Sequence, residues 1–254
     1  MINRVDHGSG ADHVAVLQLA HGPVNAMDQE LCEALAEQFR ALETDPARAV
    51  VVTGTGRAFS AGVDLKRILD EGAPYVERFL PALSAAFGAL FQLSKPVVAA
   101  VNGHAIAGGC VLAACADVTL MAEGSGRIGV PEARVGPPFP RLAIEVLRHA
   151  VGDVAARRLM VGALTYTPAD AQALGLVDRV LPADELLGQA VTTARALATE
   201  VPSDTFALTK AQLRRDALER TARYADEDEA VATLWSRRAA DGWTARYLES
   251  VTRR

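Results

Sequence analysis

Two glycine-rich stretches decide the fold: GTGRAFSAGVDL at positions 54–65 and NGHAIAGGC at positions 102–110. Each follows a short apolar run that predicts a strand buried on both faces, AVVVT at 49–53 and VVAAV at 97–101. Each leads into a helical pattern. A helix that begins in such a loop presents free N–H groups, and glycine lets a ligand approach them closely. Two such loops together predict a site where backbone N–H groups hold an oxygen atom.

Each loop alone has a plainer explanation. Glycine-rich connections from strand to helix also bind phosphate groups, or simply make tight turns. Neither stretch contains the complete phosphate-binding patterns GxxxxGK[ST] or GxGxxG. The functional interpretation therefore depends on the two loops occurring together, in this order.

The elements around the loops alternate between strand and helix. The pattern predicts strands over 13–20 and 117–122, and helices over 28–42, from Asp64 onward, over 73–94 and up to Ala114. This rhythm fits either a doubly wound α/β sheet or a spiral of ββα turns. From Phe139 the chain is predicted to be nearly all helical, apart from a strand-like stretch over 176–181. Thr167-Pro168 starts one helix, and the acidic run at 226–229 is interpreted as a solvated helix start.

Composition excludes several classes of function. Half of the 254 residues are hydrophobic, 22% are charged and the net charge is −5, so the chain can bury a large core but lacks the basic surface that binds nucleic acid or anionic membranes. The N-terminus has no apolar run of a signal peptide and no stretch is long enough to span a membrane, so we expect a cytoplasmic protein. The cysteines, Cys32, Cys110 and Cys115, have no metal-type spacing and are interpreted as core residues.

Taken together, the motifs resemble those of the crotonase (enoyl-CoA hydratase/isomerase) superfamily. The resemblance rests on RAFSAGVDL at 57–65, KPV at 95–97, the loop at 102–109, CAD at 115–117, PVNA at 23–26 and ADAQALGLV at 169–177. It implies an α/β fold with a ββα spiral core over residues 1–200 and a helical C-terminal trimerisation region over 201–254. It also implies a homotrimer or a dimer of trimers.

The resemblance assigns roles to particular residues. Val63 and Gly108 match the positions whose N–H groups hold the thioester oxygen of an acyl-coenzyme A substrate, each donor contributing about 3 kcal/mol to the transition state. Lys66 matches a basic residue near the coenzyme A phosphates, and is equally well explained as an exposed helix lysine. The remaining positions expected to bind substrate are Val24, Ala26, Ala61, Gly62, Asp64, Gly109, Val111 and Phe139.

One catalytic carboxylate of the hydratases is missing. Hydratases of this family use two glutamates, which correspond here to Val111 and Glu132. Hydration needs a water molecule oriented by both groups, whereas a shift of a double bond needs one base whose pKa burial has raised. The sequence is therefore closest to the Δ3,Δ2-enoyl-CoA isomerase branch, which also has an aliphatic residue at the first position. The loop GPPFP at 136–140 replaces the glycine-rich loop of the hydratases and agrees with this choice, although it is also explained as neutral variation.

Other polar residues near the motifs are predicted to have structural roles. We interpret Asp64 as a helix N-cap, Glu145 as an ordinary helix residue and His104 as structural. Ser60 lies outside a GxSxG pattern and is not predicted to be a nucleophile. Arg134 would lower the pKa of Glu132 if it pointed inward, and we expect it to point outward.

The sequence leaves three functions open. The first is isomerisation of a 3-enoyl-CoA by Glu132, and the second is hydration or another crotonase reaction such as dehydration, decarboxylation or thioester hydrolysis. The third is a non-catalytic subunit that only binds coenzyme A. In each case the expected partner is an acyl-CoA thioester, with coenzyme A entering as part of the substrate and no permanently bound cofactor or metal.

Overall fold

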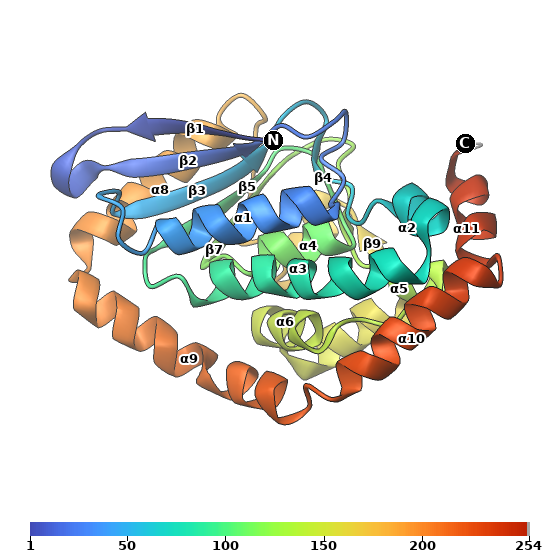
Figure 1. Ribbon diagram of the computed structural model, residues 1–254. Coiled ribbons are helices and arrows are strands. Elements are labelled where there is room, and N and C mark those ends of the chain that lie inside the picture. The colour runs from blue at the N-terminus through green and yellow to red at the C-terminus, as the bar shows by residue number, and fades with distance from the viewer. Residues whose placement is uncertain (253–254) are drawn as a thin grey trace.

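Two β-sheets form the centre of the molecule in the computed structural model, which describes residues 1–252 (Figure 1). The larger sheet has the strand order β1-β2-β3-β5-β7-β10 and the smaller one the order β4-β6-β8-β9. The strands of the larger sheet are β1 Ile2–His7, β2 Val14–Leu19, β3 Ala49–Gly54, β5 Val97–Val101, β7 Val118–Ala122 and β10 Arg179–Leu181. Those of the smaller sheet are β4 Ala58–Ser60, β6 His104–Ile106, β8 Ile128–Gly129 and β9 Thr165–Tyr166.

The chain runs as a spiral between these sheets. Strand pairs β3 and β4, β5 and β6, and β7 and β8 each place one strand in the larger sheet and the next in the smaller sheet. Strand β5 pairs in parallel with β3 and β7, and β6 pairs in parallel with β4 and β8. A doubly wound fold would place all of these strands in one sheet, so the ββα spiral is confirmed.

Helices cover both faces of the larger sheet. Alternate residues of β3 and β5 enter two separate apolar clusters: Val50 and Val97 belong to one, Val51 and Val98 to the other. Helices α1 and α3 pack against each other over the first cluster, and α8 covers the second. This burial on both faces explains why the two runs are apolar throughout. The helices are α1 Gln29–Ala41, α2 Leu65–Glu71, α3 Ala73–Gln92, α4 Gly108–Ala114, α5 Glu132–Val135, α6 Arg141–Gly162, α7 Pro168–Leu174, α8 Leu186–Glu200, α9 Ser203–Arg223, α10 Glu227–Ala240 and α11 Trp243–Thr252.

The helix starts agree with the sequence predictions. Asp28 accepts a hydrogen bond from the N–H of Leu31 at the start of α1, and Thr167 accepts one from Asp170 at the start of α7. The acidic run at 226–229 does begin α10, but Asp228 also accepts a hydrogen bond of 2.8 Å from the N–H of Arg141. Asp228 therefore caps the start of α6 from a different helix.

The predictions missed several strands. The two glycine loops contain β4 and β6, and β1, β8 and β9 were also not predicted. The strand-like stretch at 176–181 is a strand only from Arg179 to Leu181. Four of the missed strands are two or three residues long and belong to the smaller sheet. Such short runs have no periodicity to recognise, because their pairing partners define them.

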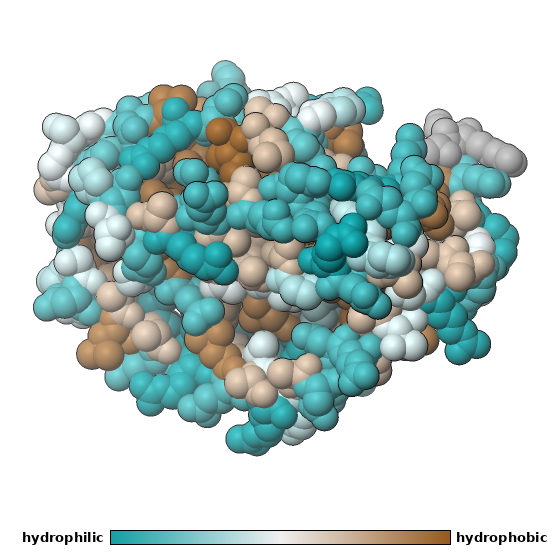
Figure 2. All heavy atoms as spheres, in the orientation of Figure 1, coloured by the Kyte–Doolittle hydropathy of each residue, from teal (hydrophilic) through white to brown (hydrophobic). Residues whose placement is uncertain are grey.

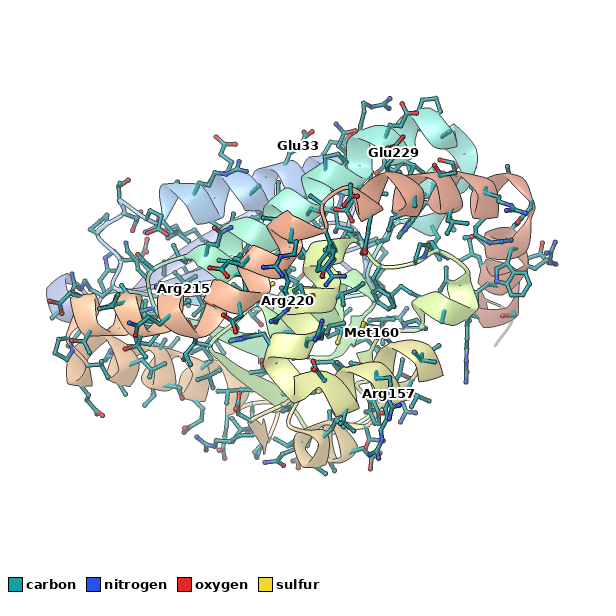
Figure 3. All side chains as sticks on the ribbon, turned by 90° about the horizontal axis from the view of Figure 1, so that it is seen from below. Glu33, Arg157, Met160, Arg215, Arg220 and Glu229 are labelled. Carbon is teal, nitrogen blue, oxygen red and sulfur yellow. The ribbon has the colours of Figure 1, made fainter. Side chains whose placement is uncertain are left out.

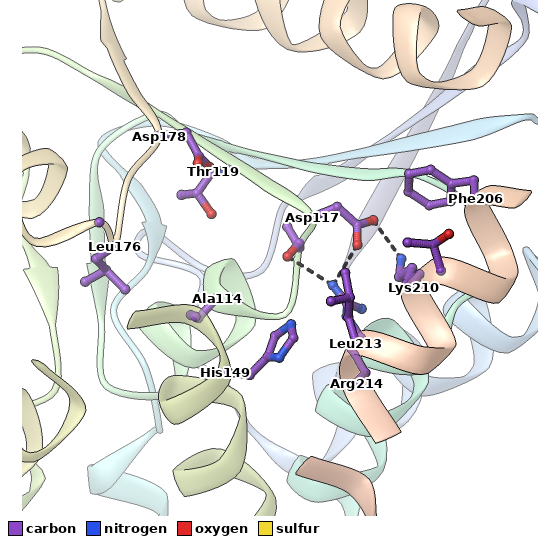
Figure 4. A pocket seen from close by; sticks show the side chains of 14 residues that line it. Ala114, Asp117, Thr119, His149, Leu176, Asp178, Phe206, Lys210, Leu213 and Arg214 are labelled. Carbon is purple, nitrogen blue, oxygen red and sulfur yellow. Dashed lines mark hydrogen bonds and ion pairs between the residues drawn. The ribbon is translucent and has the colours of Figure 1, made fainter. Parts of the chain in front are cut away.

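The last three helices wrap around the body of the same chain. Helix α9 contacts α6, α10 contacts α3, and α11 contacts α5 and α2. In the middle of α9, Lys210 and Arg214 each donate a hydrogen bond of 2.7 Å to Asp117 (Figure 4). Burial lowers the pKa of Lys210 to about 8, while the charge of Asp117 opposes this shift. This cluster gives the Asp117 of the CAD motif a structural role.

The surface is mixed in character. The face shown in Figure 2 is mostly hydrophilic, with apolar residues in separate patches. Within residues 1–252, no helix is both long and apolar enough to cross a membrane.

Candidate active site

The first glycine loop is held in place by Asn25 and Ser60. Asn25 is fully buried, has a positive φ of 50°, and donates from Nδ2 to the carbonyls of Ala58 and Phe59. Ser60 donates from Oγ to the carbonyl of Asn25 at 2.7 Å and accepts from the N–H of Gly62. These bonds connect the PVNA motif to the loop, and they use both hydrogen-bonding capacities of the serine. Ser60 is therefore a structural residue, as predicted.

The second loop turns sharply into α4. Ala107 has a φ of 55°, a region that a residue with a side chain rarely adopts, and the helix begins at the next residue, Gly108. The two loops touch here, since a Cβ atom on Gly62 would lie 2.5 Å from the carbonyl oxygen of Ile106 and 3.3 Å from the nitrogen of Gly108. Gly62 must therefore be glycine for the loops to approach each other.

The N–H groups of Val63 and Gly108 are both available to a ligand. In the parallel bridge between Met27 and Val63, Met27 bonds to Gly62 and Asp64, so the N–H of Val63 points to the opposite side. Gly108 is the first residue of its helix, where the N–H has no partner within the helix. Within residues 1–252, neither group donates to a protein acceptor.

Two cavities lie beside these N–H groups: Val63 lines both of them, and Gly108 lines the smaller one. The outer cleft has a volume of about 700 Å³, and the inner chamber has a volume of about 20 Å³. Val63, Glu132 and Trp235 line both. The inner chamber is also lined by Leu83, Phe87, Gly108, Val111, Pro138, Phe139, Pro140 and Ala143. The outer cleft is also lined by Pro23, Val24, Ala26, Ala61, Asp64, Leu65, Lys66, Ile106, Ala107, Pro131, Val135, Pro137, Tyr247, Leu248 and Val251.

Glu132 is the titratable residue at the junction of the cavities. It is 8% exposed, and its Oε2 atom is buried without a hydrogen-bond partner among residues 1–252. Burial, which disfavours the charged form, raises its pKa to about 8. Arg134 is exposed and forms no ion pair with Glu132 in the described chain, as expected. The site therefore contains a carboxyl group that can be either protonated or ionised near neutral pH.

The predicted site residues fall into three groups. Val63, Gly108, Glu132, Val111 and Phe139 meet at the inner chamber. Lining the outer cleft are Val24, Ala26, Ala61, Asp64 and Lys66. Gly62 and Gly109 line neither cavity.

Packing explains the two glycines outside the cavities. A Cβ on Gly109 would lie 2.4 Å from the carbonyl oxygen of Ser60, so this glycine, like Gly62, lets the two loops pack together. The prediction that they contact substrate is not supported by their positions.

Asp64 and Lys66 lie at the start of α2. Asp64 accepts hydrogen bonds from the N–H groups of Lys66 and Arg67, which confirms its role as an N-cap. The Lys66 side chain is exposed, so its charge is free to meet an anionic group of a ligand in the outer cleft.

Glu145 differs from its prediction. It lies on a helix as expected, but it is fully buried and pairs with three arginines, Arg141, Arg148 and Arg220. Arg220 comes from α9 where that helix passes α6 (Figure 3). Glu145 therefore joins the C-terminal helices to the body of the protein.

The cysteines and other metal-binding side chains form no further centre. Cys32, Cys110 and Cys115 are buried and free, and burial raises the pKa of each thiol. In the described part of the chain, no group of three or more His, Cys, Asp or Glu residues is placed to hold a metal ion.

Sequence reasoning missed the contribution of the C-terminal helices. Trp235 of α10 lines both cavities, and Tyr247 of α11 lines the outer cleft, where burial and the nearby charge of Glu132 raise its pKa. Helix α11 is joined to α5 by two hydrogen bonds: Trp243 donates to the carbonyl of Arg134 and Thr244 to that of Val135. No local motif marks these residues, since helical spacing alone does not show which body surface a helix will cover.

A spiral core with two touching glycine loops beside a buried carboxyl group is the architecture of a crotonase-type enzyme. The family model for enoyl-CoA hydratase/isomerase matches residues 9–250. The chain belongs to the enoyl-CoA hydratase/isomerase family.

Individual relatives carry two different names. The chain is 37% identical to the "Putative enoyl-CoA hydratase" of Thermus thermophilus, over 90% of this chain and 91% of that protein. It is 30% identical to the human mitochondrial enoyl-CoA delta isomerase 1, over 88% of this chain and 74% of that protein. The crystal structure of human mitochondrial delta3-delta2-enoyl-CoA isomerase superposes with a TM-score of 0.88 at 25% identity, covering 98% of each chain.

Proposed function

We propose that this protein is a Δ3,Δ2-enoyl-CoA isomerase, which moves the double bond of a 3-enoyl-CoA to the 2-position. The observation that carries the proposal is that, among residues 1–252, Glu132 is the one carboxylate lining the inner chamber. Val111 lines the same chamber, at the position where hydratases have their other glutamate. Asp64 reaches only the outer cleft, and its carboxylate is already engaged in capping α2.

One carboxylate is sufficient for the isomerisation. Ionised Glu132 removes a proton from C2 of the substrate, and the electron pair of the broken C–H bond delocalises onto the thioester oxygen. The N–H groups of Val63 and Gly108 hold that oxygen as its negative charge develops. Protonated Glu132 then returns the proton to C4, where the electron pair of the former C3–C4 double bond forms the new C–H bond. The C2–C3 bond becomes the double bond, and the thioester carbonyl is restored. The reaction consumes no water and needs no other reactant.

We assign the two cavities to the two parts of an acyl-CoA. The outer cleft, with its largely apolar lining and exposed Lys66, is proposed to take coenzyme A, with the lysine near the phosphates. The inner chamber is proposed to take the acyl group. In this mechanism coenzyme A enters as part of the substrate, and the chain's own residues perform both proton transfers without a resident cofactor.

Hydration of a 2-enoyl-CoA is the second candidate function. The relative from Thermus thermophilus with the name of a hydratase favours it. Against it, Val111 offers no group to orient a water molecule opposite Glu132, and orientation is a large part of such a rate. The isomerase is therefore preferred.

We also propose that the protein assembles with copies of itself as a trimer or a dimer of trimers. Leu208 and Leu213 on α9 are 60% and 67% exposed, so contact with another copy there would remove large apolar side chains from water. The exposed face of α9 is the surface proposed for this contact.

Two assays on the purified protein test the proposed reaction. With 3-hexenoyl-CoA, an isomerase produces the ultraviolet absorbance of the conjugated 2-enoyl thioester without forming 3-hydroxyacyl-CoA. With 2-hexenoyl-CoA, a hydratase removes this absorbance and forms the hydroxy product. Rapid loss of 2-hexenoyl-CoA with no turnover of the 3-enoyl isomer would replace the proposal by hydration. Binding of hexanoyl-CoA without turnover of either substrate would indicate the non-catalytic subunit.

A further inference from the structure

The wall between the two cavities is built by a residue from outside the spiral core. Trp235 lies on α10, is 4% exposed, and lines both the outer cleft and the inner chamber. Because it lines both cavities together with Val63 and Glu132, the indole lies where the two cavities adjoin, beside the groups proposed to react. An acyl group that reaches from the outer cleft into the inner chamber must therefore pass this side chain.

The inner chamber has room for very little. Its volume of about 20 Å³ corresponds to roughly one water-sized group. Its walls, including Leu83, Phe87 and Phe139, are large apolar side chains, so an acyl group entering it would find favourable but closely limited contacts. A substrate with C2 to C4 beside Glu132 would have space for about one or two further carbons.

The wall is held in place from two sides. The indole Nε1 of Trp235 donates a hydrogen bond of 2.8 Å to the carbonyl of Pro138, in the loop that also contains Pro137 and Pro140. On its other side the indole packs against Phe79 of α3, with 6.3 Å between ring centroids. Displacing the indole would break this hydrogen bond and expose a packed aromatic contact, and the prolines restrict the backbone of the loop.

We propose that Trp235 determines the length of acyl group that the protein accepts, and restricts it to short thioesters of up to about six carbons. The inference rests on the proposed acyl-CoA function, because it assigns the inner chamber to the acyl group. It gives the C-terminal helices a part in substrate selection, since α10 supplies the wall that the chamber shares with the outer cleft.

Binding and turnover together test the proposal. Dissociation constants of saturated hexanoyl-CoA and dodecanoyl-CoA are measured by calorimetry, and kcat/KM is measured for 3-hexenoyl-CoA and 3-dodecenoyl-CoA. For the unmodified protein we expect the six-carbon ligand and substrate to be favoured by about 100-fold, because a chamber without room for the added methylenes rejects them. In Trp235→Ala this preference should fall to about 10-fold or less, mainly through a gain on the twelve-carbon compounds.

Two further variants serve as controls. Trp235→Phe keeps an aromatic wall and should give an intermediate preference, so it carries the test if Trp235→Ala does not fold, as judged by circular dichroism. Leu234→Ala changes the neighbouring, partly exposed residue of the same helix and should leave the preference unchanged.

The outcomes separate this inference from the proposed reaction. Equal binding of both chain lengths by the unmodified protein, or an unchanged preference in folded Trp235 variants, would overturn the role of Trp235. Discrimination in binding that the variants relax, without isomerase turnover, would support the role of Trp235 and reject the isomerase.

Discussion

Two buried glutamates lie thirteen positions apart and have opposite surroundings. Glu145 is fully buried and pairs with Arg141, Arg148 and Arg220. Glu132 is almost as buried, yet its Oε2 atom has no hydrogen-bond partner within residues 1–252. Burial of a carboxylate is tolerated when cations surround it, and otherwise shifts its pKa upward. The comparison shows that the partners of a buried carboxylate, rather than its depth, separate a residue that joins helices from one whose pKa burial raises.

The largest expected effect is the loss of turnover in Glu132→Gln. The amide keeps the shape of the side chain but cannot accept the C2 proton, so kcat/KM for 3-hexenoyl-CoA should fall by about 10³- to 10⁴-fold. Steady-state kinetics check this result. The matched control is Glu145→Gln, whose kcat should stay within a few-fold of the unmodified protein. Similar losses in both variants would remove the distinction between the two residues.

The next effect concerns stability against pH. Folding raises the pKa of Glu132 from its ordinary value of 4.5 to about 8, so the folded protein binds this proton more tightly than the unfolded chain does. Glu132 therefore makes its full contribution to the free energy of unfolding below pH 4.5, and this contribution is lost as pH rises toward 8. The expected loss in the free energy of unfolding is about 3 kcal/mol between pH 5 and pH 8. Urea unfolding of the unmodified protein and Glu132→Gln at both pH values measures the difference. A parallel pH dependence in the two proteins would contradict the assignment.

Removing the charge of the other glutamate should affect folding instead. Glu145→Gln leaves three arginines without their shared carboxylate, and these side chains are only partly exposed. We expect a loss of about 2 to 3 kcal/mol in the free energy of unfolding, below the range for fully buried pairs because solvent reaches the arginines. Chemical denaturation at pH 7 measures it. Unchanged stability would show that the cluster does not hold α9 against α6.

The smallest effect is the pH dependence of the rate. Because Glu132 must be ionised to act as a base, kcat/KM should rise about tenfold per pH unit below pH 7 and level off above about 8. Rates between pH 6 and 9 with 3-hexenoyl-CoA provide the measurement. A rate that is already constant at pH 6 would mean that the reactive group has an ordinary carboxyl pKa.

Much of the fold could be predicted from local sequence. The runs at 49–53 and 97–101 are apolar throughout because both faces of these strands are buried, and Asp28, Asp64 and Thr167 start helices as their chemistry predicts. The short strands of the smaller sheet could not be predicted, since two or three residues carry no periodicity and are defined only by pairing across the spiral.

The amino-acid sequence by itself determined the residues of the two loops, the presence of Glu132 and the absence of its partner at Val111, because these depend on residue identity and order. Only the tertiary structure decided how these groups are used. It brought Val63, Gly108 and Glu132 to one chamber, which Trp235 from α10 also lines. It also placed three arginines around Glu145, while the Oε2 atom of Glu132 has no hydrogen-bond partner among the residues that the structure describes. The physical reason is that burial, cavity size and pKa depend on neighbours from distant parts of the chain, and local sequence does not specify those neighbours.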